Sequence, residues 1–222
     1  MESVIIYCGG KCGSMSLART FHNARYNVIH THGKNTTLSS YKNGTRVTKR
    51  YSHSDELFTF IKNQKNKVYI IDSYRDPIER KVSSFFYNNR KYRNISNPPL
   101  KEMFEKVSKE IEEYHPLNEV FEHFGIEPFK QFDFEKGYNI TTIGNVVLIK
   151  IRFKDISSWE KILSEIFKKR ISIIPDNLSK NTFLKQQFLK GYIQNGILLD
   201  SEFYIYNSPE EQVQYKNKWN FK

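Results

Sequence analysis

The stretch from Val4 to Phe21, VIIYCGGKCGSMSLARTF, decides the fold that this sequence predicts. Its first five residues are apolar or aromatic and mostly β-branched, which is typical of a buried parallel strand. A glycine-rich turn that carries Lys11 follows, and from Ser14 on the apolar residues recur at helical spacing. We therefore expect a strand, a tight turn and a helix N-terminus in succession, an arrangement that binds anions such as phosphate.

The order of residues in this turn excludes two common nucleotide motifs. The triphosphate-binding P-loop ends in Gly-Lys-Ser or Gly-Lys-Thr, whereas here Lys11 precedes Gly13. The dinucleotide fingerprint needs a further glycine that does not follow Gly13 at the required distance. An ordinary strand-to-helix turn explains the stretch taken alone equally well, so a second motif is needed.

That second motif begins at Arg75, directly after the apolar stretch from Lys67 to Tyr74, which predicts another buried strand. In RDPIERKVSSF, Asp76 is expected to cap a helix that begins at Pro77, and Glu79 occupies the carboxylate position of a capping box. The helix pattern places Arg80, Ser83 and Tyr87 on a polar face, which a solvated helix surface would also explain.

The two motifs together resemble those of sulfotransferases that use 3′-phosphoadenosine 5′-phosphosulfate (PAPS). The order Lys-x-Gly-Ser-x-Ser-Leu from Lys11 is similar to their 5′-phosphosulfate loop. The order Arg-Asp-Pro-x-x-Arg-x-x-Ser-x-Phe from Arg75 is similar to their element for the 3′-phosphate. Both motifs follow an apolar strand and occur in the family's order, so the chain is identified as similar to a PAPS-dependent sulfotransferase.

The resemblance implies a set of cofactor-binding residues and a metal-free reaction. Lys11 would lie near the bridging oxygen of PAPS and act in catalysis, while Arg75 and Ser83 would hold the 3′-phosphate. Met15 departs from the family pattern, because many members have a hydroxyl residue there. The expected cofactor-binding residues are Gly10, Lys11, Cys12, Gly13, Ser14, Met15, Ser16, Arg75 and Ser83.

A hydroxyl acceptor needs a general base, for which His32 and then His30 are the first candidates. The stretch from Tyr26 to His32 reads as a strand, and two residues that are two positions apart point to the same face. Ligands of open α/β sheets bind at the carboxyl ends of the strands. Three other residues are alternatives for the base: His53, His115 and Glu119.

The expected reaction moves a sulfuryl group from PAPS to a hydroxyl or amine of an acceptor, with a carbohydrate as the first expectation. The tail Asn217-Lys218-Trp219 is similar to a sequence in sulfotransferase-like proteins of capsular polysaccharide synthesis. Two alternatives stay open. One is a domain that binds a nucleotide or glycan without turnover, and the other is a phosphotransferase with a degenerate P-loop.

Length and composition favour one α/β domain over residues 1–222, a three-layer sandwich with a central, mainly parallel sheet of the P-loop-like sulfotransferase type. The net charge of +11 suits an anionic ligand, but the basic residues are spread along the chain, so we expect no nucleic-acid partner.

The two cysteines do not complete a zinc site and are expected to be reduced, which favours a cytoplasmic location. We expect no signal peptide, and no apolar run reaches the roughly 20 residues that span a bilayer.

The rest of the chain gives further expectations. The polar stretch from Asn35 to Arg50 reads as a surface loop that covers the site, and Gly125 to Thr142 reads as irregular. Asn145 to Phe153 predicts a strand, followed by a helix from Trp159 that Ser157 or Ser158 caps. Other helices are expected from Ser52 or Ser54, from Pro98, from Pro116, over 181–194, and from Ser208-Pro209 to Trp219.

Overall fold

The computed structural model describes residues 2–33, 37–42, 45–50, 54–89, 116–176 and 201–219. Contacts divide the chain into two compact units. The first unit consists of Met1–Tyr74 and Tyr114–Asn177, and the second of Arg75–Glu113 and Leu178–Lys222. The prediction of a single domain over residues 1–222 stays a prediction.

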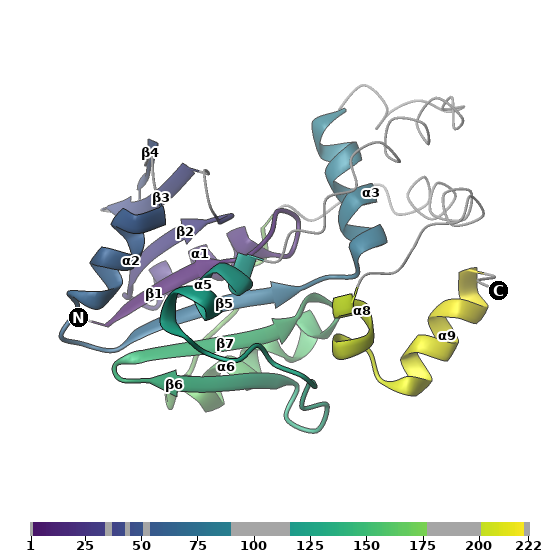
Figure 1. Ribbon diagram of the computed structural model, residues 1–222. Helices are drawn as coiled ribbons and strands as arrows, with labels where there is room; N and C mark the ends of the chain where they lie inside the picture. The colour runs from purple at the N-terminus through teal and green to yellow at the C-terminus, as the bar shows by residue number, and fades with distance from the viewer. Residues whose placement is uncertain are drawn as a thin grey trace. The chain divides into compact units, whose positions relative to one another are not determined.

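The first unit is built on a mixed sheet whose four central strands run parallel (Figure 1). These are β2 (Asn27–Thr31), β1 (Ser3–Tyr7), β5 (Val68–Tyr74) and β7 (Val146–Arg152), neighbours in that order. The prediction of an α/β fold is therefore confirmed. The sheet is less parallel than expected, because all three outer strands pair antiparallel with their neighbours.

The outer strands lie in the two stretches that the sequence predicted to lack regular structure. The first stretch forms a hairpin of β3 (Thr37–Lys42) and β4 (Thr45–Arg50), so the loop prediction for Asn35 to Arg50 was wrong. Both strands contain β-prone residues such as Thr, and the sequence between them is Asn-Gly, a strong hairpin signal. A hairpin at the edge of a sheet needs little apolar surface. The polar composition of this stretch therefore led to the prediction of a loop.

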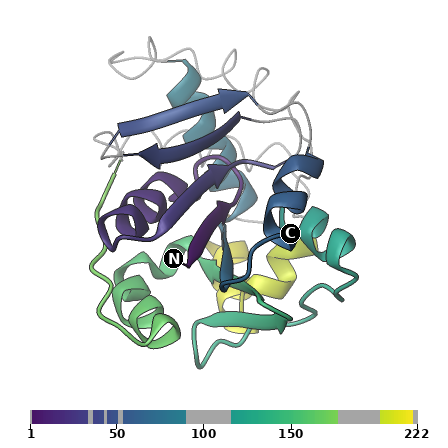
Figure 2. The ribbon, with the colours of Figure 1, turned by 90° about the vertical axis from the view of Figure 1, so that its left-hand side faces the viewer.

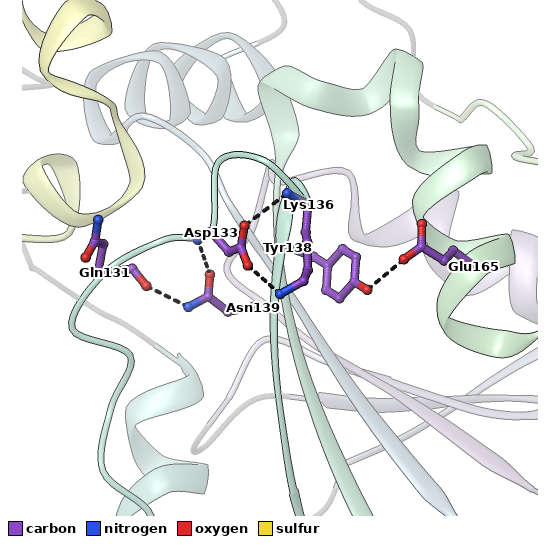
Figure 3. A network of polar contacts seen from close by, with 6 residues as sticks. All are labelled: Gln131, Asp133, Lys136, Tyr138, Asn139 and Glu165. Carbon is purple, nitrogen blue, oxygen red and sulfur yellow. Dashed lines mark hydrogen bonds and ion pairs between the residues drawn. The ribbon is translucent and has the colours of Figure 1, made fainter.

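The second stretch contains β6 (Tyr138–Ile143), so the prediction of irregular structure was wrong for its last residues. Gly144, with a φ of 57°, begins a two-residue turn that joins β6 to β7. Side chains hold the turn before β6 in place (Figure 3): Asn139 accepts from the Asp133 N–H and donates to the Gln131 carbonyl. Tyr138 then donates to Glu165 at 3.0 Å and ties this edge of the sheet to helix α6 (Trp159–Phe167).

Helices cover both faces of this sheet (Figure 2). Helices α1 (Ser14–Asn23) and α6 pack on one face, with Val4, Ile6, Ile71 and Ile149 in their core. Helices α2 (Ser54–Lys62) and α5 (Pro116–Phe124) pack on the other face, with Ile5, Ile70 and Leu148. Consecutive residues of a strand enter opposite cores because strand side chains alternate between faces. The expected layering of helix, sheet and helix is thus present in the first unit.

The second unit contains α3 (Pro77–Asn88), α8 (Ser201–Tyr206) and α9 (Pro209–Trp219) among its described residues. The predicted start of α9 is confirmed by a complete capping box: the Glu211 N–H donates to Ser208 Oγ, and the Ser208 N–H donates to the Glu211 carboxylate. In the first unit the predicted cap of α6 is not made, because Ser158 forms no side-chain cap and a short 3-10 helix over Phe153–Ser158 leads into α6 instead.

The helices predicted from Ser54, Pro77 and Pro116 begin at those residues, as expected. The helices predicted from Pro98 and over 181–194 lie outside the described residues. None of the helices in the described ranges has both the length and the apolar character needed to cross a lipid bilayer.

An ion pair is buried at the carboxyl end of the sheet, on the α2 and α5 face. Lys150 Nζ lies 2.7 Å from Asp72 Oδ2, and both side chains are 2% exposed. The two residues are in register on β5 and β7. A charge this deep is tolerated because its partner compensates it, and removal of one partner leaves the other uncompensated.

We predict that Lys150→Met lowers the free energy of unfolding by about 3–5 kcal/mol, measured by urea denaturation, because the Asp72 carboxylate would remain buried and unpaired. The double variant Asp72→Leu/Lys150→Met should recover much of this loss. Lys136→Met is the matched control, since Lys136 bonds Asp133 at the same 2.7 Å but on the surface, where its side chain is 61% exposed. Equal losses in Lys150→Met and Lys136→Met would contradict this account.

Candidate functional site

The turn between β1 and α1 lies where the order of the strands reverses. From β1 the chain runs through α1 to β2 on one side, and it later returns through α2 to β5 on the other side of β1. Helices α1 and α2 lie on opposite faces of the sheet. In open α/β sheets this reversal is the place where ligands bind, at the carboxyl ends of the strands.

The turn combines two left-handed residues with a helix start that no side chain caps. Lys11 and Gly13 both adopt left-handed conformations, with φ values of 68° and 81°. Gly13 occupies the N-cap position of α1, and no side chain caps the helix there. The first intrahelical hydrogen bond runs from the Leu17 N–H to the Gly13 carbonyl at 3.1 Å. The N–H groups of the first turn therefore need another acceptor, which an anion can supply together with the favourable helix dipole.

Aromatic side chains of the late chain fix the position of Gly13. A Cβ atom on Gly13 would lie 2.7 Å from the ring of Trp159 and 3.1 Å from the ring of Phe153. Trp159 is fully buried, and its indole N–H donates to the Arg152 carbonyl at 2.9 Å. Glycine is required here both by the left-handed backbone and by the close approach of Trp159.

Both cysteines of the turn are buried free thiols. Burial raises the pKa of the Cys8 thiol well above its usual range, and the nearby Asp72 carboxylate raises it further. Cys12 Sγ donates to the Gly10 carbonyl at 3.7 Å. Cys8 therefore stays neutral and adds no negative charge that would repel an anion at the turn.

Two serines in the first turn of α1 are buried. Ser14 and Ser16 are 4% and 3% exposed. Ser16 Oγ accepts a hydrogen bond from the Asp176 N–H at 3.0 Å, so its own hydrogen is left to be donated elsewhere. The predicted residues from Gly10 to Ser16 thus lie together in one turn of the first unit, whereas their role in binding PAPS stays a prediction.

The two predicted histidines lie together at the end of β2 but in different environments. Their rings meet edge to face, with centroids 4.7 Å apart. His30 is only 2% exposed, whereas His32 is half-buried. His32 Nδ1 lies 2.8 Å from the Cys8 carbonyl, so in the neutral ring the proton is on Nδ1 and the lone pair is on Nε2. Because His32 is the more exposed of the two, it is a better candidate for a general base than His30.

Arg75 and Ser83 belong to the second unit. The Arg75 guanidinium lies 3.8 Å from the Glu79 carboxylate, and its side chain is 16% exposed. Asp76 caps α3 as predicted, since its Oδ1 accepts the Glu79 N–H at 3.0 Å. Ser83 is buried, at 7% exposed, although the helix pattern placed it on a polar face that solvent would cover.

The structure also brings together polar residues that sequence reasoning did not combine. The hydroxyl of Tyr7, the last residue of β1, donates to the carboxylate of Glu119 in the first turn of α5. Ser73 Oγ on β5 is buried and has no hydrogen-bond partner within the described ranges. Neither Tyr7 nor Ser73 stands out in the sequence, because a tyrosine or serine at the end of an apolar strand has no distinctive pattern. Of the alternative bases, Glu119 is described, while His53 and His115 lie outside the described residues.

Among the residues that the structure describes, no group of three or more His, Cys, Asp or Glu side chains could hold a metal ion. Comparisons of the chain with protein-family models, with curated proteins and with solved structures found no match.

We predict that Gly13→Ala lowers the free energy of unfolding by about 2–5 kcal/mol, because it combines left-handed strain with overpacking against Trp159. Urea denaturation followed by circular dichroism measures the loss. Gly10→Ala is the control, since a Cβ there meets nothing within 4 Å, and its effect should stay within about 0.5 kcal/mol. A similar loss in both variants would show that the contact with Trp159 does not constrain the turn.

Proposed function

We propose that this protein is a PAPS-dependent sulfotransferase. The observation that carries the proposal is the glycine turn with left-handed Lys11 and Gly13, which leads from a central strand into an α1 without a side-chain cap. The order of residues in this turn resembles the family's 5′-phosphosulfate loop and departs from the triphosphate P-loop. The second motif, from Arg75, adds the element that the family uses for a 3′-phosphate.

The residues of the turn fit an anionic ligand. The uncapped N–H groups, the buried serine hydroxyls and Lys11 are all donors. The neutral Cys8 thiol and the buried hydroxyl of Ser73 add no negative charge at this end of the sheet. Met15 supplies no hydroxyl where many family members have one, so the backbone would have to make up that contact.

PAPS supplies an activated sulfuryl group with a phosphate leaving group. The bond between sulfur and the phosphate oxygen breaks as a bond from sulfur to the acceptor oxygen or nitrogen forms, and the acceptor loses one proton. Lys11 and the first-turn N–H groups of α1 would stabilise the charge that grows on the leaving phosphate. His32 Nε2 would accept the proton, since its Nδ1–H is held by the Cys8 carbonyl. Arg75 and Ser83 are assigned to the 3′-phosphate.

We expect the product 3′,5′-bisphosphate, PAP, to stabilise the protein by about 2.7 kcal/mol at a hundredfold excess over its dissociation constant. ATP lacks the 3′-phosphate and should stabilise it distinctly less at the same concentration. Thermal unfolding with each nucleotide measures the difference, with 5′-AMP as a second reference. Equal shifts with ATP and PAP would contradict the proposal and would favour a phosphotransferase.

We expect His32→Asn to lower kcat for sulfuryl transfer by about 10²–10⁴ while PAP affinity is retained. The asparagine amide can still donate to the Cys8 carbonyl, so the variant removes the base and keeps this bond to the turn. The wild-type rate should fall as the pH drops through the imidazole pKa, ordinarily near 6.5, because the protonated ring cannot accept a proton. Labelled PAPS screened against carbohydrate hydroxyl and amine acceptors gives the assay.

His30→Asn is the matched control, because His30 neighbours His32 but is almost fully buried. It should change kcat far less than His32→Asn does. If the acidic limb of the pH–rate profile persists in His32→Asn, the base lies elsewhere, and Glu119→Gln is the next variant. A protein that binds PAP but transfers no sulfuryl group to any acceptor would be a binding domain.

A further inference from the structure

One carboxylate oxygen in the second unit accepts two hydrogen bonds from different parts of the chain. Asp76 Oδ1 receives the Glu79 N–H at 3.0 Å, which is the N-cap of α3. The same oxygen receives the hydroxyl of Tyr215, on α9, at 2.8 Å. The residues that make this second contact are 139 positions apart in the chain. The start of α3 is therefore held by α9 as well as by its own backbone.

Tyr215 is itself fixed within the second unit. Its ring packs against Phe203 of α8, with centroids 4.9 Å apart. The capping box at Ser208 sets where α9 begins, and the Gln212 side chain donates to the Asn207 carbonyl at 2.8 Å. The Tyr215 hydroxyl thus reaches Asp76 from α9, whose start is fixed by the capping box and whose packing is fixed by Phe203. Because the Tyr215 ring is held in place, its hydrogen bond restrains the orientation of the Asp76 carboxylate.

Arg75 is part of the same assembly. It directly precedes the capping residue Asp76, and its guanidinium lies 3.8 Å from the Glu79 carboxylate. Glu79 is the residue whose N–H Asp76 holds. The direction in which the Arg75 side chain points therefore depends on the cap of α3, and the cap depends on Asp76 keeping its present rotamer.

We propose that Tyr215 is a positioning residue for the 3′-phosphate subsite, acting through Asp76 on Arg75. This inference rests on the proposed function, because it takes Arg75 to be the residue that binds the 3′-phosphate. Without the Tyr215 hydroxyl, Asp76 and the first turn of α3 gain conformational freedom, and Arg75 must be ordered when the ligand binds. That ordering lowers affinity for a 3′-phosphate and leaves the contacts of a 5′-phosphate unchanged.

The experiment compares Tyr215→Phe with the wild-type protein by calorimetric titration of PAP and of 5′-AMP, which lacks the 3′-phosphate. The variant keeps the ring that packs on Phe203 and removes only the hydroxyl. We expect the PAP dissociation constant to rise about tenfold, as for a lost hydrogen bond to a charged group, and that of 5′-AMP to stay within about twofold. In the transfer assay KM for PAPS should rise while kcat at saturation is retained.

Two further variants separate positioning from a general structural effect. Tyr204→Phe is the matched control, because Tyr204 lies on α8 and is 49% exposed, and it should alter neither affinity. In an Arg75→Ala background, Tyr215→Phe should cause no further loss of PAP affinity, because the residue it positions is absent.

Each other outcome overturns the inference. Equal losses of PAP and 5′-AMP affinity in Tyr215→Phe would show a structural role only, and so would additive losses with Arg75→Ala. Unchanged PAP affinity in Tyr215→Phe would overturn the inference while leaving the proposed function intact. A wild-type protein that binds PAP no better than 5′-AMP would overturn the assignment of Arg75, and both proposals would fall with it.

Discussion

The close packing of Gly13 against Trp159 and Phe153 is the constraint on which the candidate site depends. Because no Cβ fits between Gly13 and the indole ring, the turn after β1 can lie directly on the residues that follow β7. The indole in turn is held by the Arg152 carbonyl. Where α1 begins, and thus where its uncapped N–H groups lie, is fixed by residues about 140–146 positions later in the chain. The geometry of the turn is therefore a property of the whole first unit and not of the turn alone.

The carboxyl ends of the parallel strands carry polar groups in pairs. Tyr7 bonds Glu119, Asp72 pairs with Lys150, and Arg152 pairs with Asp155 at 2.5 Å. Two of these pairs join different elements, β1 with α5 and β5 with β7, so they fix the ends of the strands relative to their neighbours. A buried polar group that is left unpaired costs several kcal/mol, and these three pairs avoid that cost. These pairs hold the carboxyl ends of the strands in place, beside the turn and the two histidines.

The proposed chemistry makes different demands on the two histidines, and the structure gives them different environments. A base must reach the acceptor and present a lone pair, which suits half-buried His32 with its proton on Nδ1. His30 is enclosed and meets His32 edge to face, so it is better placed to hold its neighbour than to react. The contact of His32 with the Cys8 carbonyl also links the candidate base to the turn that would bind the leaving phosphate. Binding and proton transfer would then share one backbone segment.

The sequence by itself determined the parallel core, the turn and most helix starts. Apolar runs such as Val4 to Cys8 can be recognised because burial on both faces demands them. Asp76 and Ser208 mark helix starts by local chemistry, and the apolar spacing from Ser14 marks the start of α1. The antiparallel outer strands β3, β4 and β6 were not foreseen, because their mostly polar residues form no continuous apolar run that would mark them as strands. Only the tertiary structure decided that Trp159 presses on Gly13, that Tyr215 reaches Asp76 and that His32 bonds Cys8. These contacts join residues that are far apart in the chain. Local propensity and periodicity contain no information about which distant side chain will contact a given residue.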